Sequence, residues 1–213
     1  MDEQMRARLH DYVTNLYAAP DDALRAIQAE AARHDLPQIS LNPSEGRLLQ
    51  VLARAVNARR AVEIGTLAGY SGTWLARALP ADGKLYTLEM NPKHAVVARA
   101  NFEQAGVGER VEVLEGDALA LLDGLRAHGP FDLVFIDADK DRYPQYLDWT
   151  VENLRAGGLV TAHNAFRHGG VLSPETDADH AMHAFNRALA EHPRLLATII
   201  DVGDGMAVGV KLS

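Results

Sequence analysis

The side chains best suited to chemistry directly follow an apolar run at residues 133–136. They are Asp137, Asp139 and Lys140, which lie close together in the sequence. A charged group is costly to bury without partners, so a charged cluster that ends an apolar strand should face a cleft. Carboxylates can hold a cation, and a lysine whose pKa is lowered by its surroundings can accept a proton. This cluster therefore predicts a reaction centre.

Three other expected strands also end in polar residues or glycine. They end in the segment 63–71 (Glu-Ile-Gly-Thr-Leu-Ala-Gly-Tyr-Ser), at Glu89, and at residues 116–118 (Gly-Asp-Ala). In an open parallel sheet ligands bind beyond the carboxyl ends of the strands, so these four ends should converge. Glu89 can accept hydrogen bonds from both ribose hydroxyls of an adenosyl group, and Asp117 can accept one from the adenine amine. The order of these signals favours a cofactor that carries a nucleoside.

The glycine spacing in the first of these turns argues against a nicotinamide cofactor. A dinucleotide site uses G-x-G-x-x-G, in which the middle glycine admits the pyrophosphate to a helix N-terminus. Here Gly65 and Gly69 are present, but Leu67 occupies the middle position. A nicotinamide dehydrogenase is therefore the least favoured function.

An alternation of strands and helices must position these residues. Short apolar runs predict the strands, and longer amphipathic segments predict the helices between them. The expected strands are residues 59–66, 84–90, 110–118, 131–139 and 157–164, and the expected helices between them are 71–79, 91–106, 117–127 and 143–157. Residues 197–212 contain two strand-like runs around Gly-Asp-Gly, which predicts an antiparallel hairpin. We therefore expect an α/β fold with a Rossmann-like, doubly wound mixed sheet, mostly parallel, with helices on both faces.

Helices also precede the first strand. Residues 1–35 are expected to form two amphipathic helices, the second with Asp21 or Asp22 as its cap. A third expected helix follows before the first strand. Because no repeat or flexible linker divides the chain, residues 1–213 are expected to form one domain, with N-terminal helices at 1–57.

Composition narrows the possible functions. The chain has 213 residues, a formal net charge of -8 and no cysteine. The acidic balance gives no general attraction to nucleic-acid phosphates, and any metal must use oxygen or imidazole ligands. No apolar run approaches the length of a membrane span, and the first residues lack the apolar core of a signal peptide. We expect a cytoplasmic protein that acts on small molecules, with neither a membrane nor a nucleic acid as its partner.

Several segments together resemble the cation-dependent O-methyltransferase family, which includes caffeoyl-CoA and catechol O-methyltransferases and uses S-adenosylmethionine (SAM). The similar segments are VEIGTLAGYSG at 62–72, FIDADKDRYPQYL at 135–147, residues 41–46, Phe185-Asn186, and VGDG at 202–205. The resemblance covers nearly the whole chain. It implies a methyl donor contacted by Glu63, Gly65, Thr66, Ser71, Glu89, Asp117, Ala118 and Asp137.

The resemblance also implies a divalent cation, held by the aspartate that ends the fourth strand and by an Asp-Asn pair that ends the fifth. The corresponding residues here are Asp137, His163 and Asn164, so an imidazole replaces one carboxylate. Magnesium prefers oxygen ligands, whereas imidazole suits zinc, iron, cobalt or nickel. Two alternatives follow: the three residues hold a metal of softer preference, or the site has no metal and His163 is a general base.

The expected reaction is transfer of the SAM methyl group to a hydroxyl of a small phenolic or catechol-like acceptor. Lys140, Asp137 and His163 are the expected catalytic residues, and Lys140 would take the hydroxyl proton. Two other functions stay open, namely methylation of a hydroxylated tRNA nucleoside and binding of SAM without catalysis. The N-terminal helices resemble the segment that supports dimers in this family, which implies a homodimer.

Overall fold

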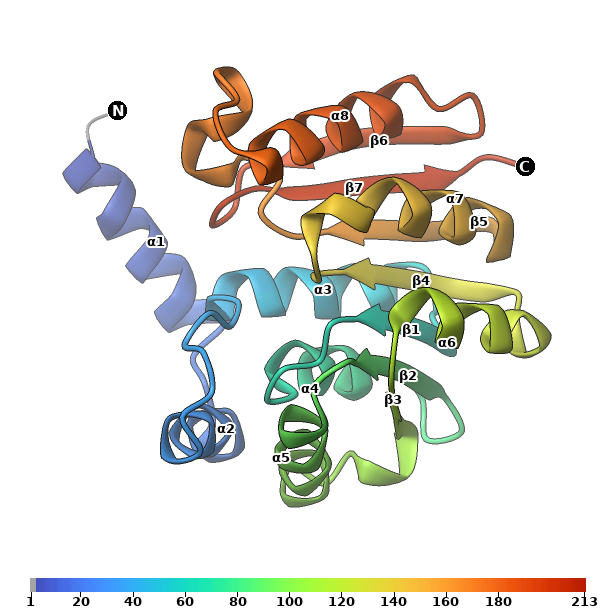
Figure 1. Cartoon of the computed structure of the whole chain (residues 1–213). Helices are drawn as coiled ribbons and strands as arrows, with labels where there is room; N and C mark the ends of the chain where they lie inside the picture. Colours follow the sequence, from blue (N-terminus) through green and yellow to red (C-terminus); the bar gives the residue numbers. More distant parts are fainter. Residues whose placement is uncertain (1–2) are drawn as a thin grey trace.

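The computed structural model describes residues 3–213, in which a seven-stranded mixed sheet carries helices on both faces (Figure 1). The strands are β1 (Arg60–Ile64), β2 (Lys84–Glu89), β3 (Val111–Glu115), β4 (Phe131–Ile136), β5 (Leu154–Ala162), β6 (Leu195–Ile200) and β7 (Met206–Lys211). Their order is β3-β2-β1-β4-β5-β7-β6. The strands from β3 to β5 are parallel, and β7 is antiparallel to both of its neighbours. The predicted Rossmann-like mixed sheet and its C-terminal hairpin are therefore confirmed.

Two apolar layers hold the helices on the sheet. The helices are α1 (Glu3–Tyr17), α2 (Asp22–Arg33), α3 (Pro43–Ala55), α4 (Tyr70–Ala78), α5 (Pro92–Gln104), α6 (Ala118–Leu125), α7 (Tyr143–Asn153) and α8 (Asp177–Glu191). Side chains alternate along β4, so Leu133 and Phe135 join the layer under α3, α4 and α5, while Val134 and Ile136 join the layer under α6, α7 and α8. Within the described residues there are also four short 3-10 turns: η1 (Gly108–Arg110), η2 (Arg126–His128), η3 (Lys140–Arg142) and η4 (Arg167–Leu172).

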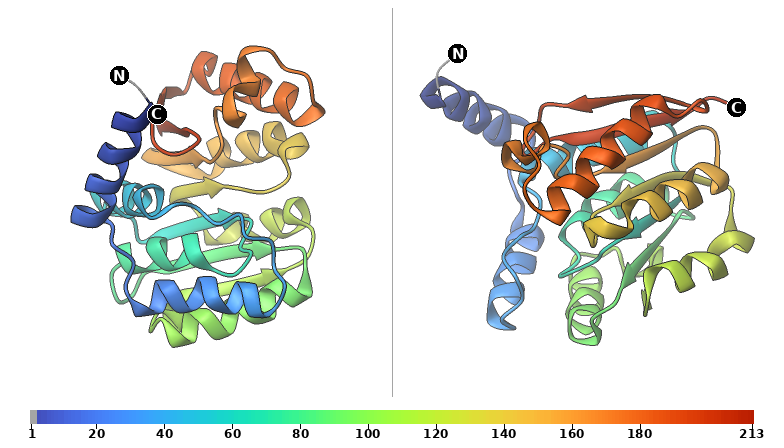
Figure 2. Two further views of the ribbon diagram at one scale, coloured as in Figure 1. Left: turned by 90° about the vertical axis from the view of Figure 1, so that its left-hand side faces the viewer. Right: turned by 45° about the horizontal axis from the view of Figure 1, so that its top comes forward.

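Helix α1 projects from this body, as both views of Figure 2 show. It contacts α3, and it leaves Leu9, Tyr12, Leu16 and Tyr17 largely exposed. Residues 1 and 2, which the first predicted helix included, lie outside the described residues. Among residues 3–213, no helix is both long enough and apolar enough to span a membrane.

The register of the central strands brings the predicted functional residues together. Ile64 pairs with Ile136, and Ile136 pairs with Ala162, so β1, β4 and β5 end side by side. The backbone continues this alignment beyond the strands, because the amide of Asp137 donates to Ile64 and that of His163 donates to Ile136. One edge of the sheet therefore carries the residues that follow each strand.

One predicted boundary is wrong. The expected helix 143–157 ends at Asn153, and β5 begins at Leu154, earlier than the expected strand at residue 157. Leu154 pairs with Phe131, and the register then shifts at an irregularity before Leu159. Gly157 adopts the left-handed φ of 73° in this stretch, which glycine tolerates without strain. The strand therefore continues through the glycines with a shift in register.

Candidate active site

A cavity of about 850 Å³ opens at the carboxyl edge of the parallel strands. Its volume lies within the range of small-molecule sites. Of the residues predicted to function, those lining the cavity are Gly65, Thr66, Ser71, Glu89, Ala118, Asp137, Lys140, His163 and Asn164. The sequence motifs therefore do converge on one site.

Gly65 lets two loops meet at the floor of this cavity. Its φ of 100° favours glycine, and a Cβ at this position would lie 2.2 Å from the carbonyl oxygen of Asp137. Any larger residue would push the β1 loop away from the β4 loop. The glycine is thus required by both conformation and close approach.

Glu63 lies behind the cavity wall and is fully buried. The hydroxyls of Ser71 and Thr87 each donate to its carboxylate at 2.6 Å. Burial raises the pKa of Glu63 to about 7, although these two hydrogen bonds oppose the shift. Ser71 lines the cavity and Glu63 does not, so the hydrogen bond from Ser71 is what links Glu63 to the cavity.

Glu89 ties the first two strand ends together. One carboxylate oxygen accepts from the amides of Thr66 at 3.3 Å and Leu67 at 2.8 Å, and the other accepts from Asn91 at 2.8 Å. A carboxylate offers about four acceptor positions, so Glu89 retains capacity for a ligand hydroxyl. Its side chain is oriented by the backbone on both sides.

Asp117 does not line the cavity, although its neighbours Gly116 and Ala118 do. Its side chain caps α6 by accepting from the amide of Ala120 at 3.2 Å, and it forms an ion pair with Arg142. The Arg142 guanidinium lowers the pKa of this carboxyl. The structure therefore directs the Asp117 carboxylate to the helix and to Arg142.

Lys140 is a largely buried amine beside Asp137. Its Nζ donates to Asp137 Oδ1 at 3.2 Å and contacts the hydroxyl of Tyr143, which in turn donates to the carbonyl of Ile136. Burial lowers the pKa of Lys140, while the nearby Asp137 carboxylate opposes this shift. Such an amine loses its proton more easily than a solvated lysine.

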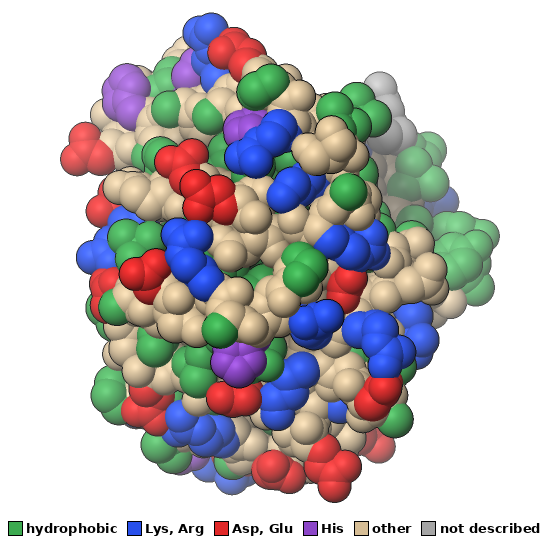
Figure 3. Space-filling view, turned by 90° about the vertical axis from the view of Figure 1, so that its right-hand side faces the viewer, with side chains coloured by type: hydrophobic (Ala, Val, Ile, Leu, Met, Phe, Trp, Pro, Cys, Tyr) green, Lys and Arg blue, Asp and Glu red, His purple; other side chains and the backbone are tan. Residues whose placement is uncertain are grey.

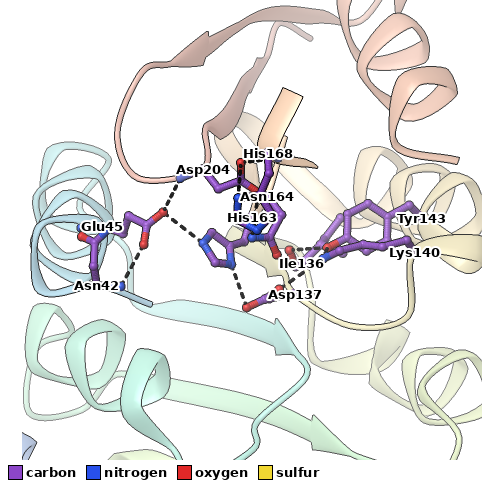
Figure 4. A network of polar contacts seen from close by, with 10 residues as sticks. All are labelled: Asn42, Glu45, Ile136, Asp137, Lys140, Tyr143, His163, Asn164, His168 and Asp204. Carbon is purple, nitrogen blue, oxygen red and sulfur yellow. Dashed lines mark hydrogen bonds and ion pairs between the residues drawn. The ribbon is translucent and has the colours of Figure 1, made fainter. Parts of the chain in front are cut away.

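His163 bridges two carboxylates from distant parts of the chain (Figure 4). Its Nδ1 lies 3.1 Å from Asp137 Oδ2, and its Nε2 lies 3.0 Å from Glu45 Oε1. Burial alone would lower the pKa of His163, but the hydrogen bonds and charges of Asp137 and Glu45 outweigh it and raise the pKa to about 9. The ring is thus charged near neutral pH, which argues against a general-base role.

Glu45 reaches His163 because a capping box fixes it at the start of α3. Its amide donates to Asn42 Oδ1 at 3.0 Å, and its own Oε2 accepts from the amide of Asn42 at 2.8 Å. The amide of Asp204 adds a further hydrogen bond to Glu45 Oε1 at 3.3 Å. The exposed fraction of Glu45 is only 2%. Helix α3 and the turn between β6 and β7 therefore hold this carboxylate from two sides.

Asn164 completes the cluster on the side of the β6–β7 turn. Its backbone has a positive φ of 56°, and its Nδ2 donates to Asp204 Oδ2 at 3.2 Å. Asp204 Oδ1 accepts from the amide of His168 at 2.7 Å. Asp204 thus joins the β5 loop to the turn that covers Glu45.

The predicted ligand set of Asp137, His163 and Asn164 does not fit a divalent cation in this arrangement. A histidine ligand needs a free ring lone pair, but both nitrogens of His163 face carboxylate oxygens. Across residues 3–213, no three His, Asp or Glu side chains form a group that could hold a metal ion.

Glu45 and Asp204 were missing from the predicted functional residues. The spacing Asn42-x-x-Glu45 before an apolar helical run is a capping-box signal that the sequence carries. It predicts the start of α3 but not the contact with His163, which depends on how α3 packs against the hairpin. Asp204 lies within the VGDG segment and carried no separate signal.

Comparisons with known proteins agree with this geometry. A sequence model described as O-methyltransferase matches residues 15–212. The chain is 40% identical to a catechol O-methyltransferase of Niastella koreensis, over 99% of each chain, and 43% identical to one of Mycobacterium tuberculosis, over 93% of each. It superposes with a TM-score of 0.92 on a crystal structure from Klebsiella pneumoniae described as an O-methyltransferase, at 37% identity over 99% of each chain. With TomG of Streptomyces achromogenes, an O-methyltransferase solved in complex with SAM, the TM-score is 0.91 at 35% identity over the whole of both chains. The chain belongs to the SAM-dependent O-methyltransferase family.

Proposed function

We propose that this protein transfers a methyl group from SAM to a hydroxyl of a small phenolic or catechol-like acceptor. The observation that carries the proposal is the buried amine of Lys140, which lines the cavity beside Asp137 and has a lowered pKa. The names of the catechol O-methyltransferases that it resembles support the acceptor class.

The ends of β1, β2 and β3 are the part of the cavity suited to the adenosyl group. Glu89 would bind a ribose hydroxyl with its remaining acceptor capacity, and Gly65 and Thr66 would lie along the nucleoside. Ser71, backed by Glu63, supplies a fixed hydroxyl at the same wall. SAM supplies an electrophilic methyl group on a positively charged sulfur.

The end of β4 is the part suited to the acceptor. Neutral Lys140 would remove the proton from the acceptor hydroxyl, and Asp137 and Tyr143 would orient the amine. The acceptor oxygen then bonds to the methyl carbon while the carbon–sulfur bond breaks, and that electron pair stays on sulfur. The proton held on Lys140 passes to water.

We also propose that the protein is a homodimer in which α1 lies at the interface. Leu9, Tyr12, Val13, Leu16 and Tyr17 recur at helical spacing, and each is more than two-fifths exposed. Figure 3 shows the opposite side of the molecule, where acidic and basic side chains intermix with scattered hydrophobic ones. An apolar stripe of this kind is typical of an interaction surface.

The proposal is tested by incubating the protein with SAM and a panel of catechols and simple phenols, and by detecting the methylated products by mass spectrometry. Product with at least one phenolic acceptor, and none without enzyme, is the expected result. Tight binding of SAM without turnover of any phenol would instead favour a protein that binds SAM without this catalysis.

A further inference from the structure

We propose that the imidazole of His163, held between Glu45 and Asp137, takes the place of the divalent cation that the family resemblance implies, so that methyl transfer proceeds without a metal. This inference rests on the proposed function, which it deepens. It assigns Glu45 as a positioning residue that acts through His163.

The geometry of the ring carries the first step. Nδ1 and Nε2 of His163 lie 3.1 and 3.0 Å from oxygens of Asp137 and Glu45. A carboxylate oxygen only accepts hydrogen bonds, so each ring nitrogen must bear a hydrogen to satisfy its partner. A ring in that state is a cation and has no lone pair to offer a metal. The side chain therefore supplies positive charge to the site and closes it to coordination.

The second step is that Glu45 cannot withdraw from the ring. Its carboxylate accepts from the amides of Asn42 and Asp204 in addition to contacting His163. The turn at Gly203 also lies directly against it, because a Cβ at residue 203 would fall 1.9 Å from Glu45 Oε1. Removal of the charge on His163 would leave the buried carboxylate of Glu45 and the partly exposed one of Asp137 without the cation that lies between them, which is costly.

The third step concerns what an aspartate at position 163 would do. His163→Asp would place a third carboxylate next to those of Glu45 and Asp137, with Asn164 adjacent in the chain. Three carboxylates at close range repel one another unless a cation lies between them, and oxygen-rich sets of this kind bind magnesium, manganese or calcium. One substitution should therefore convert a site with an internal cation into one that takes up a metal.

Metal binding is measured first, by isothermal titration calorimetry of chelator-treated protein with Mn²⁺ and, separately, with Mg²⁺ and Zn²⁺. We expect no stoichiometric uptake by the wild type and uptake of one Mn²⁺ per chain by His163→Asp. His180→Asp, which makes the same exchange at an exposed position of α8, is the matched control and should bind no metal. Stoichiometric binding by the wild type would overturn the inference, whether or not an acceptor has been found.

Turnover is measured on the same preparations once an acceptor is known. Wild-type activity should survive chelation and change by less than about twofold when any of the metals is added. The activity of His163→Asp should depend on added Mn²⁺ or Mg²⁺. Loss of wild-type activity on chelation, restored by metal, would contradict the inference while leaving the proposed function intact.

A spectroscopic measurement isolates the role of Glu45. The ring nitrogens of His163 are observed by ¹⁵N NMR near neutral pH, where both should give the signals of protonated nitrogen. Glu45→Gln removes one of the two charges, so a signal of an unprotonated nitrogen should appear for His163 while SAM still binds. Unchanged ring signals in Glu45→Gln would show that Glu45 has only a structural role. Because this variant keeps the shape of the side chain, it also serves if His163→Asp does not fold.

Discussion

The hydroxyl of Ser71 donates to the buried carboxylate of Glu63 at 2.6 Å, so a residue of the cavity wall is coupled to a titrating group inside the sheet. The pKa of Glu63 is raised to about 7 from an ordinary value of 4.5, so the folded protein holds this proton more tightly than the unfolded chain does. Stability should therefore fall as pH rises from about 4.5 to about 7 and change little from this group above that.

Glu63→Gln should remove this dependence. The effect of Glu63 across the window is at most about 3.5 kcal/mol, because one pKa unit corresponds to about 1.4 kcal/mol. Urea unfolding of both proteins at several pH values measures it, with the difference between them as the quantity of interest. Parallel stability curves for the two proteins would contradict the raised pKa.

Lys140→Met should slow methyl transfer with little effect on SAM binding. Loss of a positioned base typically costs about 10²- to 10⁴-fold in kcat, whereas the Kd for SAM should change by less than about threefold. Stopped-flow turnover and calorimetry separate the two effects. Lys93→Met, an exposed lysine in the first turn of α5, is the control. A variant that lost SAM affinity but kept its kcat would exclude the base role.

Glu89→Gln should weaken SAM binding by about tenfold or more, since charged hydrogen bonds contribute roughly 1.5–3 kcal/mol each. The amide group of glutamine cannot accept from the backbone amides on both sides as the carboxylate does. Glu115→Gln at the exposed end of β3 is a matched substitution away from the cavity. Calorimetric titration with SAM should give equal affinities for the Glu115 variant and the wild type.

Asn42→Ala should affect both stability and turnover. Loss of a helix cap costs about 1 kcal/mol, and here it also frees one side of Glu45. Asn91→Ala removes the cap of α5 and should reduce stability by a similar amount while preserving kcat. Thermal unfolding measures the stability of the two variants, and steady-state kinetics measures their kcat. Equal kcat values would indicate that the α3 cap supports only the helix.

Leu16→Asp should convert the proposed dimer to a monomer, because it places a charge in the apolar stripe of α1. Size-exclusion chromatography with light scattering reports the mass directly. Val96→Asp, at another exposed apolar position on α5, should leave the mass unchanged. A wild-type protein that is already monomeric at micromolar concentration would refute the proposal.

The sequence predicted the parts of the site that follow from strand order. Asp137 and His163 come directly after parallel neighbours, so they were bound to meet at one edge once the alternating pattern was recognised. Glu45 is different, because it precedes the sheet and reaches His163 only through the packing of α3. No local pattern encodes that contact.

Two roles compete for the carboxylate of Asp117, a contact with the cofactor and the cap of a helix. Its position at a strand end favoured a contact with adenine, but its position immediately before α6 also suits a helix cap. The structure uses the carboxylate for the cap and for Arg142. Which of these roles the carboxylate takes depends on Arg142, a partner that another loop contributes and that the local sequence does not reveal.

The location of His163 between two fixed carboxylates has an evolutionary consequence. Codons for histidine and aspartate differ only in their first base, so a single nucleotide change exchanges the two side chains at this position. The carboxylates of Glu45 and Asp137 would accept hydrogen bonds from the histidine or bind a metal together with the aspartate. If His163 replaces the cation as we propose, one mutational step would thus exchange a site that carries its own positive charge for one that needs a metal.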